Sequence, residues 1–548
     1  MSIKHPLRLI FLVLLLLFFA TAIILKILNI INSNEYKKTD HLKLEEVPAN
    51  RGNIYTYNHK LLAVTSLTFD VRMDVSYANS ISSSRDIQLL ADDLSRILKN
   101  KTKEEYINYL GKNTNNRYLL LARNVLLSDI LSLKTINFYK KDLRGGIRIE
   151  EYLVREKPHS NLAARTIGDL YKDTNMPKYG IEYSYNSVLA GQGGRSLFLY
   201  EPGAGKRVIN SSNNIEAQPG KDLITTIDIN LQDILEQSLL RQLEKYEANY
   251  GTAILMEVET GQIKAISNLQ KTDQNKYAEI LNFAVTRQVE PGSTIKLASI
   301  MAYLEDFDGE LHDTIDCKNG KFRFKGAPID TKDSKKMGVV TIKEAFAQSS
   351  NIGLGRLINK YYQEDPQKFI DRLYNFGLAD KSHIDLRGVP EPNIISPSDK
   401  MWSGIALPWM SYGYGISLTP LDILTFYNAV ANYGYWKYPY LGYALKDGSK
   451  INKIIRDTIS HRICSKSTAE KVNILLREVV LSGTAKKLEK LPFKVSGKTG
   501  TAVKSYSVLK DQSSKEYQSS FVGFFPSDQP KYSCIVLVDS PNQNIGYY

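Results

Sequence analysis

Cysteine and histidine are scarce in this sequence, and their scarcity excludes whole classes of protein. Only three cysteines occur among 548 residues, Cys317, Cys464 and Cys534, and none belongs to a Cys-x-x-Cys pair. An odd number of isolated cysteines argues against a disulfide framework and against a zinc site. No cluster of histidine and cysteine is available as a ligand set, so we expect neither a metal nor another cofactor.

The excess of basic residues is not concentrated in any one segment. The formal net charge is +13, yet Lys and Arg are spread along the whole chain, without a dense block or an aromatic-interleaved basic stripe. This distribution does not favour nucleic-acid binding. Apolar residues make up 43% and charged residues 24%, which are the proportions of a folded protein. The length predicts two or three domains.

Charge is absent from one long stretch near the N-terminus. Leu9–Leu25 contains neither a charged residue nor a proline, and after Lys26 the apolar run continues to Ile31. A helix that spans a bilayer needs about 20 apolar residues, so this stretch is long enough. We therefore expect a transmembrane helix over residues 9–31.

The flanking charges predict the orientation of this helix. Lys4 and Arg8 lie in the short tail of residues 1–8, and a positive tail stays in the cytoplasm. The protein is then a single-pass protein of the inner (cytoplasmic) membrane, with the remainder of the chain on the periplasmic side. The alternative is a signal peptide cleaved after Ala20-Thr21-Ala22, but cleavage there would leave an apolar run at the new terminus.

The rest of the chain divides into three parts. Residues 32–46 are polar and read as a stalk. Residues 47–220 mix short strand-like runs with helical patterns and contain no constellation that looks catalytic, which suggests a spacer or binding module. Residues 221–548 begin a new unit, in which Asp228 is a good N-cap for the helical pattern that follows.

The last unit is predicted to be an α+β domain. Two early strands, joined by the hairpin turn Thr260-Gly261, and three late strands enclose a mainly helical stretch over residues 282–481. We expect these strands to form one five-stranded antiparallel sheet flanked by helices. The expected strands are Thr252–Glu259, Gln262–Asn268, Phe493–Ala502, Ser519–Phe525 and Tyr532–Asp539.

The first chemical motif is Ser293-x-x-Lys296. Pro291-Gly292 breaks the preceding segment, and Ser293 then opens an apolar helix with Lys296 on the same face. Partial burial can lower the pKa of such a lysine until it accepts the proton of the serine hydroxyl. Alone the motif is weak, because Ser293 is also a plausible N-cap and a second copy, Ser507-x-x-Lys510, lies in a polar stretch.

Two further motifs lie downstream. Ser349-Ser350-Asn351 places polar residues inside a helical pattern, where they are costly without partners. Lys498-Thr499-Gly500-Thr501 lies on a predicted strand and offers a cation and hydroxyls to a carboxylate, with a glycine where a ligand can approach the backbone. Each has a plain structural explanation, as a kinked helix or a glycine-containing edge strand.

The order of the three motifs resembles that of the penicilloyl-serine transferase superfamily. Arg51-Gly52-Asn53-Ile54-Tyr55 and Gly180-Ile181-Glu182 resemble boxes in the pedestal of class B penicillin-binding proteins, although Thr56-Tyr57-Asn58-His59 replaces the usual Asp-Arg-x-Gly. Tyr412-Gly413-Tyr414-Gly415 resembles a loop typical of the division-type members. The resemblance covers nearly the whole chain, except that the C-terminal helix of the family is expected after the sheet and is not seen here.

The resemblance implies a D,D-transpeptidase that crosslinks peptidoglycan stem peptides ending in D-Ala-D-Ala, and that β-lactams inhibit by acylation. Ser293 would be the nucleophile and Lys296 its base. Ser349 with Lys498 would relay a proton to the leaving amine, and Asn351 would orient the substrate. The substrate-binding residues would be Thr499, Gly500 and Thr501. The implied partners are a SEDS-family glycosyltransferase and other division proteins.

Several alternatives share these motifs. A soluble β-lactamase fits poorly with the anchor, and it would need a Glu-x-x-Leu-Asn loop, which is not obvious here. A penicillin-sensing receptor would carry a signalling domain, and a bifunctional class A protein would need a glycosyltransferase before the transpeptidase. An elongation-specific class B enzyme and a catalytically idle scaffold of the division complex stay open.

Overall fold

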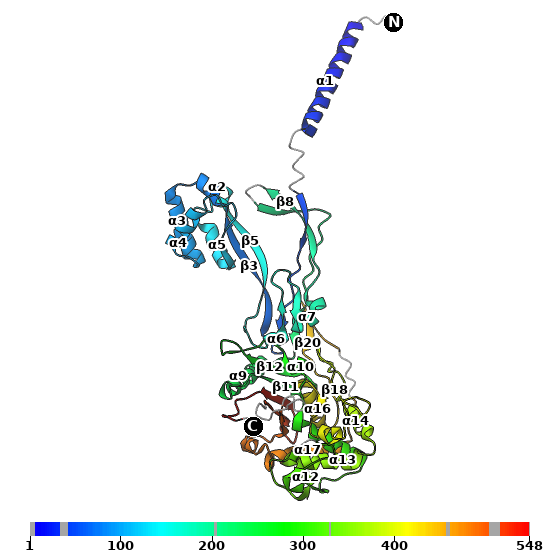
Figure 1. The fold of residues 1–548 in the computed structure, drawn as a ribbon. Helices are drawn as coiled ribbons and strands as arrows, with labels where there is room; N and C mark the ends of the chain where they lie inside the picture. The colour runs from blue at the N-terminus through cyan, green and yellow to red at the C-terminus, as the bar shows by residue number, and fades with distance from the viewer. Residues whose placement is uncertain are drawn as a thin grey trace. The chain divides into compact units, whose positions relative to one another are not determined.

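The structure, a computed structural model, describes residues 6–32, 42–201, 205–327, 330–455, 461–503 and 516–546. The chain forms two compact units, each built from several segments. The first unit comprises Met1–Arg51, Thr65–Val154 and Ala190–Gly220, and the second comprises Gly52–Val64, Arg155–Leu189 and Lys221–Tyr548. Two segments within the range 47–220 therefore belong to the same unit as the three motifs (Figure 1).

The N-terminal apolar stretch is helical. Helix α1 (Pro6–Asn32) has 27 residues. The side chains from Val13 to Asn29 are exposed. Within the described ranges, no helix combines the length and the apolar character needed to cross a membrane.

The first unit contains a lobe in which strands and helices share one core. Leu90, Leu94 and Ile97 of α3 pack with Val71 and other strand residues. The helices α3 and α4 each begin with a capping box. The elements of this lobe are β3 (Leu61–Met73), which begins in the second unit, α2 (Val75–Ser80), α3 (Ser84–Leu98), α4 (Lys103–Lys112), β4 (Leu119–Val125), α5 (Leu127–Thr135), η2 (Asp142–Gly146) and β5 (Ile147–Glu156).

A separate three-stranded antiparallel sheet completes the first unit. Its order is β1-β8-β9, formed by β1 (Leu42–Val47), β8 (Gly194–Glu201) and β9 (Gly205–Ile209). Leu42 pairs with Leu199, and Val47 with Gly194. The polar stretch over residues 32–46 therefore ends in a strand, which the sequence did not reveal because the strand alternates charged and apolar residues without a covered face.

The second unit is built on a six-stranded antiparallel sheet. Its order is β13-β12-β11-β24-β23-β22. Its strands are β11 (Tyr250–Glu257), β12 (Ile263–Lys271), β13 (Tyr277–Ala278), β22 (Ser496–Val503), β23 (Tyr517–Phe525) and β24 (Tyr532–Asp539). The five predicted strands thus form one sheet, but the prediction of five strands in all is wrong. A two-residue edge strand, β13, has too short a pattern to predict, and β22 begins at Ser496 because Phe493 and Lys494 lie outside the ladder.

Helices cover both faces of this sheet, as the α+β prediction requires. On one face α9 (Ile229–Lys245) packs Leu239 and Leu243 against Ala253 and Leu269. Asp228 caps this helix, since its side chain accepts hydrogen bonds from the amides of Asn230 and Leu231. The other face is covered by α16 (Pro420–Ala431), whose twelve residues are all buried. Helix α11 (Lys296–Asp306) lies in the same core.

The remaining elements surround this core. Figure 1 shows α12, α13, α14 and α17 grouped at one end of the unit. The helices are α6 (Ala164–Ile167), α7 (Gly180–Ser184), α8 (Asn186–Leu189), α10 (Phe283–Thr286), η3 (Gly292–Ile295), η4 (Lys318–Gly320), α12 (Ile342–Ala347), α13 (Asn351–Tyr362), α14 (Pro366–Asn375), α15 (Ala406–Met410), α17 (Lys466–Leu481) and η5 (Lys486–Lys490). The other strands are β2 (Ile54–Tyr55), β6 (Asp169–Leu170), β7 (Pro177–Tyr179), β10 (Asp222–Thr225), β14 (Thr314–Asp316), β15 (Lys321–Phe322), β16 (Thr331–Lys332), β17 (Val339–Thr341), β18 (Asn393–Ile394), β19 (Ile416–Ser417), β20 (Gly442–Asp447) and β21 (Lys450–Lys453).

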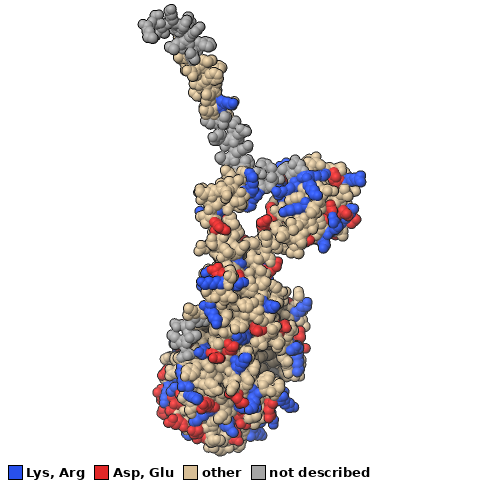
Figure 2. Space-filling view, turned by 180° about the vertical axis from the view of Figure 1, so that it is seen from behind, with Lys and Arg blue, Asp and Glu red and all other residues tan. Residues whose placement is uncertain are grey.

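Charged side chains of both signs are mixed over the visible surface. Figure 2 shows blue and red residues interspersed with uncharged ones on the face that it displays of the second unit.

Candidate active site

Ser293 lies in a single 3₁₀ turn, η3, which leads directly into α11. The sequence predicted that Ser293 begins an α-helix. In the structure it lies in a tighter 3₁₀ turn, and the α-helix begins at Lys296. Gly292 has a φ of 54°, and a Cβ there would lie 3.3 Å from both the Cβ of Ala502 and the carbonyl oxygen of Thr501. The left-handed backbone and the close strand explain why a glycine precedes Ser293.

Two other glycines let the chain close around this turn. A Cβ on Gly413, whose φ is 107°, would lie 2.2 Å from the carbonyl oxygen of Gly292. A Cβ on Gly500 would lie 2.9 Å from Cγ2 of Thr294 and 2.4 Å from Oγ of Ser520. The side chains of Thr294 and Ser520 therefore lie directly against the backbone of Gly500. The turn is held between the loop at Gly413 and strand β22.

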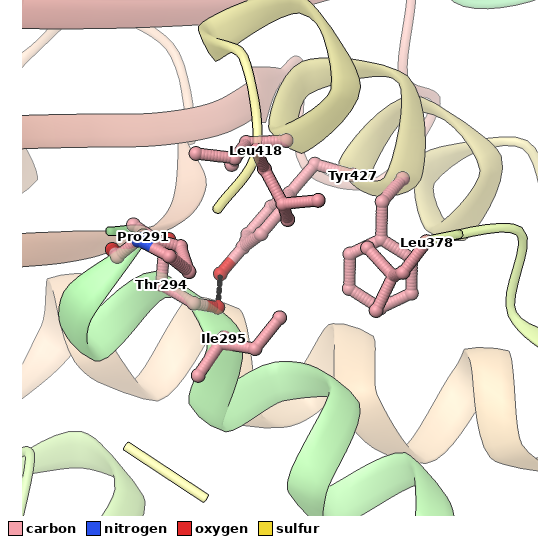
Figure 3. Close-up of a pocket in the computed structure, with 8 residues that line it drawn as sticks. Pro291, Thr294, Ile295, Leu378, Leu418 and Tyr427 are labelled. Carbon is pink, nitrogen blue, oxygen red and sulfur yellow. Dashed lines mark hydrogen bonds between the residues drawn. The ribbon is translucent and has the colours of Figure 1, made fainter. Parts of the chain in front are cut away.

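A buried tyrosine holds the backbone of the η3 turn by a hydrogen bond. The hydroxyl of Tyr427, on α16, donates a hydrogen bond of 2.7 Å to the carbonyl oxygen of Thr294 (Figure 3). Tyr427 is fully buried. The space enclosed by Pro291, Ile295, Leu418 and their neighbours has no room for a water molecule. The backbone beside Ser293 is thus anchored in a dry, packed region.

Lys296 reaches the second motif. Its Nζ donates to the carbonyl oxygen of Ser349 at 2.6 Å, to Oγ of Ser349 at 3.1 Å and to Oδ1 of Asn351 at 2.6 Å. Its side chain is completely buried. Among the described residues, the hydroxyl of Ser293 is not one of its hydrogen-bond partners.

Lys498 approaches the same serine from the sheet. Its Nζ donates to Oγ of Ser349 at 2.9 Å and to the carbonyl oxygen of Thr499 at 3.1 Å. It is also completely buried. The hydroxyl of Ser349 therefore lies between two buried lysine amines, which come from chain positions about 200 residues apart.

This environment disfavours the charged forms of both lysines. Burial lowers the pKa of Lys296 to about 7, and the carboxylate of Asp333 opposes this effect. Burial lowers the pKa of Lys498 well below its usual value, and the nearby charge of Lys296 lowers it further. Two ammonium groups that share one hydroxyl are not both charged near neutral pH, so a neutral amine is available to accept a proton.

Ser349 is held in an uncommon backbone conformation. Its φ is 58°, and it lies in the break between α12 and α13. A non-glycine residue with positive φ costs free energy and persists only where its surroundings enforce it. The hydroxyl of Ser350 caps α13 by accepting the amide of Gly353 at 2.8 Å. The break predicted from the polar run is therefore real, and it turns Ser349 toward the lysines.

One residue in this arrangement, Asp333, was not predicted from the sequence. Its carboxylate accepts the hydroxyl of Ser350 at 2.5 Å, the amide of Asn351 at 2.7 Å and the amide of Ile352 at 3.3 Å. It lies 17 residues before Ser350, just after the small hairpin β15–β16. No local pattern marks it, because its partners are brought to it by the tertiary fold.

The third motif forms the outer strand of the sheet. Strand β22 is at the sheet edge, and Thr501 is exposed while Lys498 is buried. The hydroxyls of Thr499 and Thr484 are hydrogen-bonded at 2.6 Å. The structure thus brings Ser293, Lys296, Ser349, Asn351 and Lys498 into one region. The second Ser-x-x-Lys, from Ser507 to Lys510, lies outside the described residues.

Comparison with known protein families agrees with this geometry. The model for the penicillin-binding protein transpeptidase domain matches residues 251–548, more than half of the chain. The chain belongs to the penicillin-binding protein transpeptidase family. The model for the penicillin-binding protein dimerisation domain matches residues 46–225. The prediction of a class B penicillin-binding protein, which joins these two domains, is confirmed.

Individual relatives extend over most of this penicillin-binding protein. The probable peptidoglycan D,D-transpeptidase PenA of Neisseria gonorrhoeae is 26% identical over 92% of this chain and 82% of its own length. The peptidoglycan D,D-transpeptidase FtsI of Escherichia coli K12 is 25% identical over 91% of this chain and 81% of its own. The crystal structure of penicillin-binding protein 2X from Streptococcus thermophilus superposes with a TM-score of 0.73 at 20% identity, covering 91% of this chain and 77% of that one. That likeness shows the shared fold.

Proposed function

We propose that this penicillin-binding protein crosslinks peptidoglycan stem peptides as a serine D,D-transpeptidase. The observation that carries the proposal is the placement of the Ser349 hydroxyl between two buried amines, Lys296 at 3.1 Å and Lys498 at 2.9 Å. Lys296, one of these amines, follows the nucleophile Ser293 by three residues, so a desolvated amine that can activate a serine lies at the next turn of the chain. The relatives named PenA and FtsI carry the same activity in their names.

In the first half-reaction the hydroxyl of Ser293 attacks the carbonyl of the penultimate D-alanine. Its proton passes to neutral Lys296, and the new ester bond replaces the peptide bond to the terminal D-alanine. Ser349, bridging the two lysines, passes a proton to the departing amine. Asn351 accepts a hydrogen bond from Lys296, and it orients both the Lys296 amine and the substrate amide.

The substrate is held by the edge strand. Lys498, Thr499 and Thr501 bind the terminal carboxylate, whose negative charge restores the protonated form of Lys498. The backbone amides of Ser293 and Thr501 stabilise the oxyanion, and each such donor contributes about 3–4 kcal/mol in enzymes where it has been removed. Gly500 keeps the strand close to the turn.

In the second half-reaction an amine of a neighbouring stem attacks the Ser293 ester. The amine takes the acyl group, the ester oxygen leaves with a proton, and the crosslink is formed. A β-lactam enters the first half-reaction in place of D-Ala-D-Ala. Its opened ring stays attached to the acyl group, so the acyl-enzyme persists.

The protein is proposed to be anchored in the cytoplasmic membrane. The apolar run of residues 9–31 and the basic residues Lys4 and Arg8 support a single span with a cytoplasmic tail of residues 1–8. A stalk (32–46), a pedestal (47–220) and the transpeptidase domain (221–548) then lie on the periplasmic side. A reporter fused after residue 548 is expected to be active only if it works outside the cytoplasm, and cytoplasmic activity would refute this orientation.

The relative named FtsI and the Tyr412–Gly415 loop favour a role in septal wall synthesis. A transpeptidase without a polymerase needs glycan strands made nearby, so a SEDS-family glycosyltransferase is the proposed partner. It is proposed to contact the residue 9–31 helix and the pedestal. Replacing residues 9–31 by an unrelated spanning helix, together with surface changes on the pedestal, tests this contact. If copurification and function survive both, the helix is a simple tether.

The enzymatic proposal is tested by labelling with a fluorescent penicillin. The wild-type chain is expected to become covalently labelled, and Ser293→Ala is expected to lose the label while retaining its thermal unfolding transition. A folded wild-type chain that neither labels nor releases D-alanine from a stem peptide would instead favour the idle-scaffold alternative.

A further inference from the structure

A small hairpin next to the second motif carries a local excess of positive charge. This basic hairpin comprises residues 318–327 and 330–336 and contains the short strands β15 and β16. Seven of its residues are basic and two are acidic. No long basic block marks it in the sequence, because glycine and apolar residues intervene, but the pairing of β15 with β16 brings the two halves together. The even spread of basic residues expected from the sequence is therefore wrong for this hairpin.

Neighbouring carboxylates neutralise only part of this charge. Asp330 pairs with Arg323 at 2.8 Å and with Lys321 at 3.2 Å. Lys318 pairs with Asp316 at 2.6 Å. The other four basic residues are exposed, and within the described ranges none of them forms an ion pair. These four are Lys325, Lys332, Lys335 and Lys336.

The second acidic residue of the basic hairpin, Asp333, is turned toward the active site. Its carboxylate accepts the hydroxyl of Ser350 at 2.5 Å and the amide of Asn351 at 2.7 Å. It is therefore occupied by the second motif and does not pair with the surface lysines. The outer side of the hairpin is basic, while its inner side holds a motif of the active site.

Two lysines face each other across the hairpin. Lys321 of β15 is directly opposite Lys332 of β16 in the antiparallel pair. Like charges in this position are destabilising. Asp330 pairs with Lys321, but within the described ranges no carboxylate pairs with Lys332. A carboxylate supplied by a ligand would relieve this repulsion, so the hairpin is better suited to an anionic partner than to solvent alone.

The backbone of the hairpin suits a peptide as that partner. Strands β15 and β16 form a sheet of two strands, and within the described ranges neither pairs with a third strand. An unpaired strand edge offers backbone donors and acceptors to an extended peptide. Alternate side chains of such a peptide point the same way, so acidic residues at alternate positions present their carboxylates to one side. A polyphosphate chain has the charge but lacks these backbone groups.

We propose that the basic hairpin is a docking surface for an acidic, extended segment of a partner protein. The backbone of this segment adds to the β15–β16 sheet, and its carboxylates pair with Lys332, Lys335 and Lys336. Since Asp333 connects the hairpin to Asn351, the partner contacts the protein directly beside the active site. Docking requires no acylation, so it is independent of the proposed function.

The test uses a short fluorescein-labelled peptide of alternating glutamate and threonine, titrated with the full-length protein in detergent. Fluorescence anisotropy is expected to show binding at low salt that weakens as salt is added, because exposed charges are screened. A glutamine–threonine peptide of equal length is expected not to bind. A glutamate–proline peptide carries the same charge but lacks the backbone N–H of every second residue, and it is expected to bind several-fold more weakly.

A triple variant then assigns the binding to the basic hairpin. Each exposed ion pair contributes about two- to threefold in affinity, so the loss of three lysines is expected to weaken binding about tenfold. The substitutions are Lys332→Gln, Lys335→Gln and Lys336→Gln. The matched control removes the same charge from three exposed lysines of η5 and is expected to keep the wild-type affinity. The control substitutions are Lys486→Gln, Lys487→Gln and Lys490→Gln.

Thermal unfolding of both triple variants shows whether a loss of binding is a loss of fold. Absence of salt-sensitive binding by the glutamate–threonine peptide would overturn the proposal, as would equal affinity in the wild type and the hairpin variant. Equal binding of the glutamate–proline peptide, or tighter binding of polyphosphate, would assign the hairpin to an anionic polymer instead. Displacement of the acidic peptide by a D-Ala-D-Ala stem peptide would assign it to the substrate.

Discussion

Replacing Asp333 by asparagine removes one negative charge while nearly preserving the shape of the side chain. In the wild type its carboxylate accepts three hydrogen bonds, from the hydroxyl of Ser350 and the amides of Asn351 and Ile352. Hydrogen bonds to a charged acceptor are stronger than neutral ones by about 1 kcal/mol each, and the amide of asparagine keeps some of them. We therefore expect Asp333→Asn to lower the free energy of unfolding by about 2 kcal/mol, which lowers Tm by a few degrees.

The same substitution has a second consequence that a purely structural residue would lack. The charge of Asp333 raises the pKa of Lys296 against the effect of burial. Without this charge the pKa of Lys296 falls further, so neutral amine is available at lower pH. The acid limb of the penicillin acylation rate against pH is expected to move to lower pH in Asp333→Asn.

The assay is stopped-flow or gel-based acylation by a fluorescent penicillin between pH 5 and 9, together with thermal unfolding. Asp330→Asn is the matched control, because Asp330 pairs with Arg323 at 2.8 Å and Lys321 at 3.2 Å, away from the motif. Exposed ion pairs of this kind contribute about 0–1 kcal/mol. An Asp333→Asn profile that superimposes on the wild-type profile would refute the proposed coupling to Lys296.

Three further predictions concern the groups around Ser293. The acylation rate of the wild type is expected to rise about tenfold per pH unit below the Lys296 pKa of about 7 and to level off above it, because only the neutral amine accepts a proton; a rate independent of pH from 5 to 8 would contradict this. Gly413→Ala, which forces a Cβ against Gly292, is expected to cost about 3 kcal/mol or more and to slow acylation strongly. Its control is Gly388→Ala. Gly388 also has a positive φ, 84°, but open space surrounds it, so this substitution should cost only the backbone strain. Equal Tm losses in the two variants would show that the contact between residue 413 and Gly292 is unimportant. Tyr427→Phe leaves the carbonyl of Thr294 without its buried donor and is expected to lower the free energy of unfolding by about 1–3 kcal/mol in urea titration, whereas an unchanged midpoint would mean that the bond contributes nothing.

Local sequence patterns predicted the parts of the structure that local physics determines. The hairpin at Gly261 was predictable because Thr260-Gly261 separates two strand-like runs, and a glycine readily adopts the positive φ, here 79°, of a tight turn. The late strands were predictable from their β-branched and aromatic residues. Asp228 was predictable as a cap because N-caps act within three residues.

Features set by tertiary contacts could not be predicted in this way. The 3₁₀ turn at Ser293 depends on the approach of Gly413 and β22, and Ser349 has its positive φ in the break between α12 and α13. Asp333 holds the second motif from a loop that carries no periodic signal. The two-residue strand β13 exists only because Gln270 and Lys271 of β12 offer it an edge.

The motif order indicated which residues would meet, but it carried no information on hydrogen bonding. A proton transfer between Ser293 and Lys296 was expected from their spacing. The structure instead has Lys296 bonded to Ser349 and Asn351. Such contacts often rearrange when substrate binds, because catalytic hydrogen bonds tighten only in the complex.

The most direct test of the central claim is the site of acylation. The full-length protein is treated with benzylpenicillin and digested, and the adduct is located by tandem mass spectrometry, with Ser293→Ala and Ser507→Ala treated in parallel. The account predicts one stable adduct, on the hydroxyl of Ser293, which is lost in Ser293→Ala and retained in Ser507→Ala. An adduct on Ser349 or Ser507, or an adduct that persists in Ser293→Ala, would contradict it.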